Sequence, residues 1–223
     1  LKLFSHWTRP DMAHAVSKLC RSMHNPGKPH VTALKRALRY LKGTANYGLL
    51  YAFGKSQSTA NQGIYGLYDA AHADCPDTLK STTAYTFFLA GGLISWFTKL
   101  HTYITTSTNH SEYCAAAKAS REAKWFSMLA SSIGFAHLAS PVNLFSDSQG
   151  AISMTHNPVH RSASKHVDLA DHYARECQER GITTVSYVGT KEMTADLLTK
   201  QLPRTAFEKH RATMGVMPQP NWL

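Results

Sequence analysis

The chain has 223 residues, of which 43% are hydrophobic and 17% are charged, as in a globular protein with a substantial core. No run approaches the roughly 18 to 20 apolar residues that cross a bilayer, so we expect no membrane partner. The four cysteines lack the CxxC spacing of zinc or redox sites, which favours reduced thiols in an intracellular protein. Because the chain begins at Leu1, we expect a processed product or a fragment of a longer protein.

The net charge of +10 is concentrated at the N-terminal end. Residues 1–62 hold ten Lys and Arg residues against a single acid, Asp11, whereas residues 63–223 hold fourteen against thirteen. A basic arm of this kind favours a polyanion, most simply nucleic acid, through contacts with phosphates.

Two helices are predicted in the basic arm. Thr8 would cap the first, with Pro10 in its first turn, and the Asn25–Pro26–Gly27 stretch would end it. The second runs from about Val31 to Lys42. Its predicted apolar stripe is Leu34, Ala37, Leu38 and Leu41. Its basic residues Lys35, Arg36, Arg39 and Lys42 form either a solvated face or a surface that binds nucleic acid.

A sheet is predicted after a short strand at Gly48–Tyr51 and a polar connector at 54–63. The strand Ile64–Asp69 ends on a carboxylate, and Thr82–Leu89 and Leu93–Phe97 follow with a Gly91–Gly92 turn between them. We expect these three strands to form an antiparallel meander.

A long helix is predicted from about Asn109 to Ile133. Steps of four and three residues from Glu112 give an unbroken apolar stripe of Ala116, Ala119, Ala123, Phe126, Ala130 and Ile133. Glu112 therefore stands at the head of the face that packs on the sheet. Its alternative role is a capping box with Asn109.

The strand Val142–Ser146 delivers Asp147 to the start of another helix. Taken alone, Asp147 is explained by capping that helix, although ligand sites in α/β sheets also lie at the carboxyl ends of strands. A polar loop at 156–164, a helix at 165–179 and a strand at 183–188 follow. Asp196 then falls in the first turn of a helix beginning near Thr194, where the helix dipole would stabilise it. A short helix at 207–214 comes last.

Asp69, Glu112, Asp147 and Asp196 each have a local explanation, but two of them end strands and two stand at helix starts. The order of elements predicts one mixed sheet with helices on its faces. Four carboxylates at one edge of it would form an oxygen-rich site for Mg²⁺. The sequence shows neither a catalytic Ser/His/Asp set nor a Cys/His cluster, so phosphodiester hydrolysis with two metal ions suits the site best. His156, His160, His166 and His172 form a loose cluster for which we expect surface or packing roles, with one of them open to assist proton transfer.

The chain resembles the C-terminal part of the Pol polyprotein of Ty1/copia-type retrotransposons. The motifs that carry the resemblance are Leu67–Tyr68–Asp69, Ser81–Thr82–Thr83–Ala84–Tyr85, Ile94–Ser95–Trp96, Ser111–Glu112–Tyr113, Phe145–Ser146–Asp147–Ser148–Gln149–Gly150, Asn157–Pro158–Val159, Lys165–His166–Val167–Asp168 and Ala195–Asp196–Leu197–Leu198–Thr199–Lys200. Upstream, Thr8–Arg9–Pro10–Asp11 and the run from Lys35 to Thr44 are similar to the end of the reverse transcriptase. The usual family pattern is replaced by Ala70–Ala71–His72–Ala73 after Asp69, by His110–Ser111 before Glu112 and by Ala163 before the Lys–His pair.

This resemblance implies an α/β ribonuclease H-like fold, a mixed five-stranded sheet with helices on both faces, preceded by a small helical N-terminal segment. It places a basic remnant of the reverse transcriptase thumb or connection at 1–55, a linker at 56–62, a ribonuclease H-like domain at 63–214 and a tail at 215–223.

The activity that the resemblance implies is cleavage of the RNA strand of RNA·DNA hybrids during reverse transcription. Asp69, Glu112, Asp147 and Asp196 would be the catalytic residues and would hold two Mg²⁺ or Mn²⁺ ions, without a small-molecule cofactor. The expected partners are the hybrid and the rest of the polyprotein, and the expected location is a cytoplasmic virus-like particle or the nucleus. The alternatives are a noncatalytic nucleic-acid-binding module and a structural relic of a decayed element.

Overall fold

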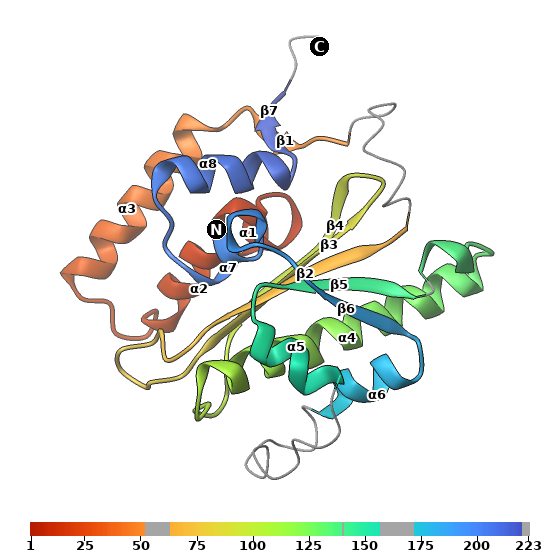
Figure 1. The fold of residues 1–223 in the computed structure, drawn as a ribbon. Coiled ribbons are helices and arrows are strands. Elements are labelled where there is room, and N and C mark those ends of the chain that lie inside the picture. Colours follow the sequence, from red (N-terminus) through yellow and green to blue (C-terminus); the bar gives the residue numbers. More distant parts are fainter. Residues whose placement is uncertain (52–62, 140, 157–171, 220–223) are drawn as a thin grey trace.

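A computed structural model describes residues 1–51, 63–139, 141–156 and 172–219 of the chain. Its centre is a five-stranded sheet with the order β4-β3-β2-β5-β6 (Figure 1). The strands are β2 (Tyr65–Ala71), β3 (Thr82–Leu89), β4 (Gly92–Leu100), β5 (Val142–Ser146) and β6 (Thr183–Tyr187). β2, β3 and β4 pair antiparallel, whereas β5 runs parallel to both β2 and β6. The predicted mixed sheet is therefore confirmed.

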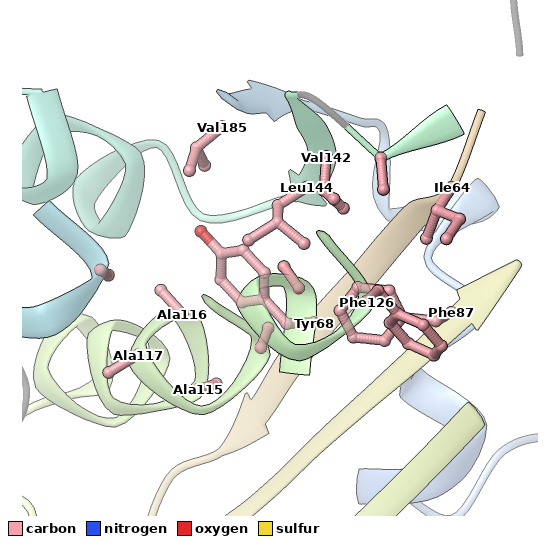
Figure 2. Packing of buried hydrophobic residues seen from close by; sticks show 14 of the residues in the cluster. Ile64, Tyr68, Phe87, Ala115, Ala116, Ala117, Phe126, Val142, Leu144 and Val185 are labelled. Carbon is pink, nitrogen blue, oxygen red and sulfur yellow. The ribbon is translucent and has the colours of Figure 1, made fainter. Parts of the chain in front are cut away.

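The long helix α4 (Thr108–Ser132) lies on one face of the sheet together with α5 (Gln149–His156) and α6 (Tyr173–Glu179) (Figure 1). Its predicted stripe is buried from Ala116 to Ala130, and only Ile133 at its end is exposed. Figure 2 shows Tyr68 of β2 and Leu144 of β5 in this core, and the Phe126 ring lies 5.3 Å from that of Phe87. Full burial of one such side chain stabilises the fold by about 1.5–3 kcal/mol.

A second core covers the opposite face, so the predicted placement of helices on both faces is confirmed. It is built by the helices α7 (Asp196–Thr199) and α8 (Arg204–Thr213), with the 3₁₀ turn Thr190–Glu192 leading into it. Among its fully buried members are Leu93, Met193, Leu198 and Met214. The alternation of β2 explains the two cores, because Leu67 faces this side while Tyr68 faces α4.

The N-terminal segment is helical, as predicted, but its first helix starts differently. α1 (Lys2–Trp7) precedes a 3₁₀ turn at Pro10–Met12, and α2 (Ala13–Arg21) begins only after it. The predicted N-cap role of Thr8 is wrong, because its hydroxyl donates back to Phe4 O of α1 (3.4 Å). Asp11 is held instead by Arg9 Nη2 (2.8 Å) and by the Tyr40 hydroxyl (2.6 Å).

Helix α3 (Lys28–Gly43) confirms the predicted second helix but only part of its apolar stripe. Ala37 is buried and Leu41 partly so, against Met12 and Val16, whereas Leu34 and Leu38 are 39% and 48% exposed. Helical spacing gives the apolar side of a helix, and a single neighbouring helix covers only part of that side.

The N-terminal segment packs against the sheet domain. Trp96 Nε1 of β4 donates to Ser5 O (2.8 Å), and Lys18 Nζ lies 2.9 Å from Asp74 Oδ2. The strand β1 (Tyr47–Leu49) pairs antiparallel with β7 (Val216–Pro218), so residues 216–218 of the predicted tail form a strand. The domain boundaries themselves stay a prediction.

Several expected features lie outside the described residues. They are the linker at 56–62, Ala163, His160, His166, most of the loop at 156–164, the first part of the helix at 165–179 and the end of the tail.

The short 3₁₀ helix Ala136–Leu138 precedes β5. Within the described parts of the chain, no helix combines the length and apolar character that a membrane span requires.

Candidate metal centre

Asp69 lies near the end of β2, opposite Ala84 of β3, and is fully buried. Both of its carboxylate oxygens have partners from the C-terminal end of α7. The Thr199 hydroxyl donates to Oδ2, and Lys200 Nζ donates to Oδ1 at 3.1 Å. The central strand thus places the buried charge of Asp69 at this edge of the sheet, and the ammonium group of Lys200 neutralises part of that charge.

Glu112 lies in the second turn of α4 and does not form the capping box that was its alternative predicted role. Ser107 is the N-cap, and its hydroxyl accepts from His110 N at 3.1 Å, so the Asn109–Glu112 capping box is absent. The Glu112 side chain is buried, and its Oε2 has no hydrogen-bond partner among the described residues. Burial raises the pKa of Glu112 to about 9, and the charges of Asp69 and Asp147 contribute to this rise.

Asp147 follows the last residue of β5 and is half-buried. Serines satisfy the amides around the start of α5, because Ser148 N donates to Ser146 Oγ (3.1 Å) and Ala151 N to Ser148 Oγ (3.3 Å). A Cβ at Gly150 would overlap the side chain of Asn109, so glycine lets this turn approach the start of α4. The Asp147 carboxylate is thereby placed beside Glu112 instead of serving as a cap.

Three of the four predicted residues converge. One carboxylate oxygen from each of Asp69, Glu112 and Asp147 lies within 4.8 Å of the others, although they come from β2, α4 and the end of β5. Three carboxylates so close repel one another, and the unpartnered Glu112 Oε2 leaves an acceptor without a donor among the residues that the structure describes. A hard divalent cation with oxygen ligands fits this donor set and would remove both penalties.

Asp196, the fourth predicted residue, is adjacent to this group but not one of the three. It is the first residue of α7 and is buried, and its Oδ1 lies 2.8 Å from the same Lys200 Nζ that contacts Asp69. Burial and the charge of Asp69 raise the pKa of Asp196 to about 7, against the lowering effect of the Lys200 hydrogen bond. The ammonium group of Lys200 therefore links Asp196 to Asp69, and through Asp69 to the group of three carboxylates.

Thr199 and Lys200 were not predicted as site residues. The signal was present in the sequence, because Lys200 stands four residues after Asp196, a spacing that lets oppositely charged side chains meet on a helix. Neither spacing nor composition could reveal that the same two residues also contact Asp69, which lies 130 and 131 positions earlier in the chain.

The described histidines of the predicted cluster have packing contacts. His156 Nε2 lies 3.1 Å from Val185 O, and Gln178 Nε2 lies 3.3 Å from His156 Nδ1. The His172 ring packs edge-on against Tyr113. These contacts agree with the expected surface or packing roles, since His156 is exposed and hydrogen-bonded and His172 packs on a ring.

The predicted nucleic-acid-binding residues Lys35, Arg36, Arg39 and Lys42 are all exposed on α3. A cleft of about 1310 Å³ separates this helix from α7 and α8, and its lining includes both Arg36 and Lys200. One open space thus extends from the basic helix to the ammonium group beside the carboxylates. Binding of nucleic acid there stays a prediction.

Pol polyproteins of plant transposons are similar to almost the whole chain. The chain is 38% identical over 209 residues to the retrovirus-related Pol polyprotein from transposon TNT 1-94 of Nicotiana tabacum, which covers 94% of the chain and 15% of that protein. It is 36% identical over 214 residues to that from transposon RE1 of Arabidopsis thaliana, covering 96% of the chain and 14% of that protein. The chain therefore spans only a small part of the length of these relatives.

Among solved structures, ribonuclease H1 from the halophilic archaeon Halobacterium salinarum aligns with 61% of the chain and 93% of its own length. The sequence identity is 16% and the TM-score is 0.40. No model of a known protein family matches the chain.

Proposed function

Because the chain belongs to the retrovirus-related Pol polyproteins of transposons, we propose that its ribonuclease H-like fold is the ribonuclease H of a copia-type element. The proposed reaction is hydrolysis of the RNA strand of RNA·DNA hybrids during reverse transcription. The observation that carries the proposal is the convergence of Asp69, Glu112 and Asp147 within 4.8 Å, with Asp196 beside them.

The four carboxylates have distinct positions in the proposed mechanism. Asp69, on the central strand, would hold a cation together with either neighbour, because it lies within 4.8 Å of Glu112 and shares the Lys200 ammonium group with Asp196. Two Mg²⁺ or Mn²⁺ ions held there would activate the attacking water and stabilise the leaving 3′ oxygen. Burial and the charges of Asp69 and Asp147 raise the pKa of Glu112, so the metal-free site favours its protonated form, and a bound cation would replace that proton as the neutralising charge.

Two of the residues that depart from the usual family pattern, His72 and His110, have partners next to α4. His72, which follows the strand, lies with its Nδ1 3.1 Å from Thr105 Oγ1. His110, two residues before Glu112, lies with its Nδ1 3.1 Å from Thr106 Oγ1. Both imidazoles thus bond to the loop before α4.

The proposal is tested by incubating the full chain with end-labelled substrates in Mg²⁺ buffer. An RNA·DNA hybrid should be cut in its RNA strand only, whereas single-stranded RNA and duplex DNA should remain intact, and EDTA should stop the reaction. Binding of the hybrid without cleavage in any Mg²⁺ or Mn²⁺ concentration would instead support the noncatalytic alternative. The rest of the polyprotein as a partner, and a location in a cytoplasmic virus-like particle or the nucleus, belong to the same proposal.

Removing the basic side chains of α3 is expected to weaken hybrid binding and its salt dependence. We expect the fourfold variant Lys35→Gln, Arg36→Gln, Arg39→Gln, Lys42→Gln to reduce the slope of log K against log salt by roughly 0.9 for each phosphate that the variant no longer neutralises. Fluorescence anisotropy of a labelled hybrid in EDTA at several salt concentrations measures this slope.

The matched control removes the same charge from exposed positions elsewhere, at Lys99, Arg180, Lys191 and Lys209. It should bind almost as the unmodified chain does. An equal weakening of binding in both variants would mean that net charge, and not the α3 surface, governs binding.

A further inference from the structure

A single ammonium group bridges two of the four carboxylates. Lys200 Nζ lies 3.1 Å from Asp69 Oδ1 and 2.8 Å from Asp196 Oδ1. The side chains of the two aspartates are 0% and 8% exposed, whereas that of Lys200 is 39% exposed. Lys200 is therefore the charge that compensates two buried carboxylates, and it does so from the solvent side.

The position of this ammonium conflicts with that of a bound cation. Asp69 also belongs to the group with Glu112 and Asp147, and its other oxygen accepts from Thr199. A divalent ion held by both Asp69 and Asp196 would compete with Lys200 for their carboxylates and would be repelled by its positive charge.

The structure also offers the side chain a place to move. Lys200 lines the cleft of about 1310 Å³ between α3 and α8, and it follows the last residue of α7. A rotation of its flexible stem into this cleft would free both aspartates without moving the sheet or α7.

We propose that Lys200 is an internal counter-cation: it neutralises Asp69 and Asp196 in the metal-free protein and is displaced into the cleft when a divalent ion binds between them. This inference rests on the metal centre of the proposed function. Lys200 is then a positioning residue with two opposite effects, since it stabilises the metal-free fold and lowers the affinity for the ion.

The test is calorimetric titration of the metal-stripped full chain with MgCl₂, without substrate. Lys200→Gln is expected to bind at least one Mg²⁺ about tenfold more tightly than the unmodified chain, because the competing charge is gone. In EDTA its melting temperature should be lower by about 2–4 °C, and saturating Mg²⁺ should close this gap. Lys200→Arg keeps the charge and should stay close to the unmodified chain in both measurements.

The control Lys209→Gln removes an exposed charge that pairs with Glu192 and should change neither quantity. Mg²⁺ affinity that is unchanged or weaker in Lys200→Gln, with an equal drop of melting temperature in EDTA and in Mg²⁺, would overturn the inference and leave Lys200 a structural residue. If the unmodified chain and all variants bind no Mg²⁺, the metal centre of the proposed function fails as well.

Discussion

Asp147→Asn is expected to lower the rate of hybrid cleavage by about 10³-fold or more, because an amide replaces a charged oxygen ligand at the point where three carboxylates meet. The fold should persist, since Asp147 is half-buried and the amides at the start of α5 bond to Ser146 and Ser148. Single-turnover cleavage of a labelled hybrid measures the rate, and circular dichroism and hybrid binding in EDTA measure the fold and the interface.

The matched control for Asp147→Asn is Glu179→Gln, which changes an exposed carboxylate on α6. It should cleave at the rate of the unmodified chain. Undiminished cleavage by Asp147→Asn would contradict the assignment of the site, whereas loss of both cleavage and circular dichroism signal would show that Asp147 also supports the fold.

Glu112→Gln is expected to stabilise the metal-free protein, with a gain that grows as the pH rises. Burial and the neighbouring charges raise the pKa of Glu112 from its ordinary 4.5 to about 9, so between these pH values the folded chain holds a proton that the unfolded chain has released. Stability contributed by this group therefore falls as the pH rises from about 4.5 to about 9. The glutamine variant lacks this loss and should be more stable by roughly 3 kcal/mol near pH 8.

Thermal unfolding in EDTA at pH 5 and pH 8 tests this prediction. The melting temperatures of the variant and the unmodified chain should be similar at pH 5 and differ by roughly 6–12 °C at pH 8. Mg²⁺ should raise the melting temperature of the unmodified chain more than that of the variant, because the variant lacks the Glu112 carboxylate as a ligand for the ion. If the melting temperatures of both proteins depend on pH in the same way, burial and the neighbouring charges do not raise the pKa of Glu112.

The sheet and its main helix could be predicted because their signals are local and repeated. The apolar stripe of α4 recurs at every turn, and Thr82–Leu89 was predicted with the bounds that β3 has. The carboxyl ends of β2 and β5 bring Asp69 and Asp147 to one edge, and the stripe of α4 brings Glu112 to the same edge. Three of the four carboxylates therefore followed from periodicity and topology.

Features that depend on distant partners could not be predicted in this way. The start of α2 is set by the contacts of Asp11 with Arg9 and Tyr40, of which Tyr40 is 29 positions away. The pairing of β1 with β7 joins distant parts of the chain, and each strand has only three residues. The Lys200 bridge likewise required knowledge of where α7 meets β2.

The N-terminal segment is tied to the sheet domain by polar contacts as well as by apolar packing. Arg211 Nη1 of α8 donates to the Tyr40 hydroxyl (3.4 Å), and Arg21 Nη2 donates to Thr82 Oγ1 of β3 (2.8 Å). Within the segment, Arg9 Nη1 donates to Thr44 O (3.0 Å). These bonds fix α3 opposite α8 across the cleft. The basic residues of α3 are thereby held in a defined position relative to Lys200.

The central claim is that the carboxylates at the edge of the sheet hold divalent cations, and anomalous diffraction from crystals of the full chain grown with Mn²⁺ tests it most directly. The account predicts an anomalous peak within coordination distance of the carboxylates of Asp69, Glu112 and Asp147. Crystals that diffract well at saturating Mn²⁺ but show no peak at these three side chains would contradict it.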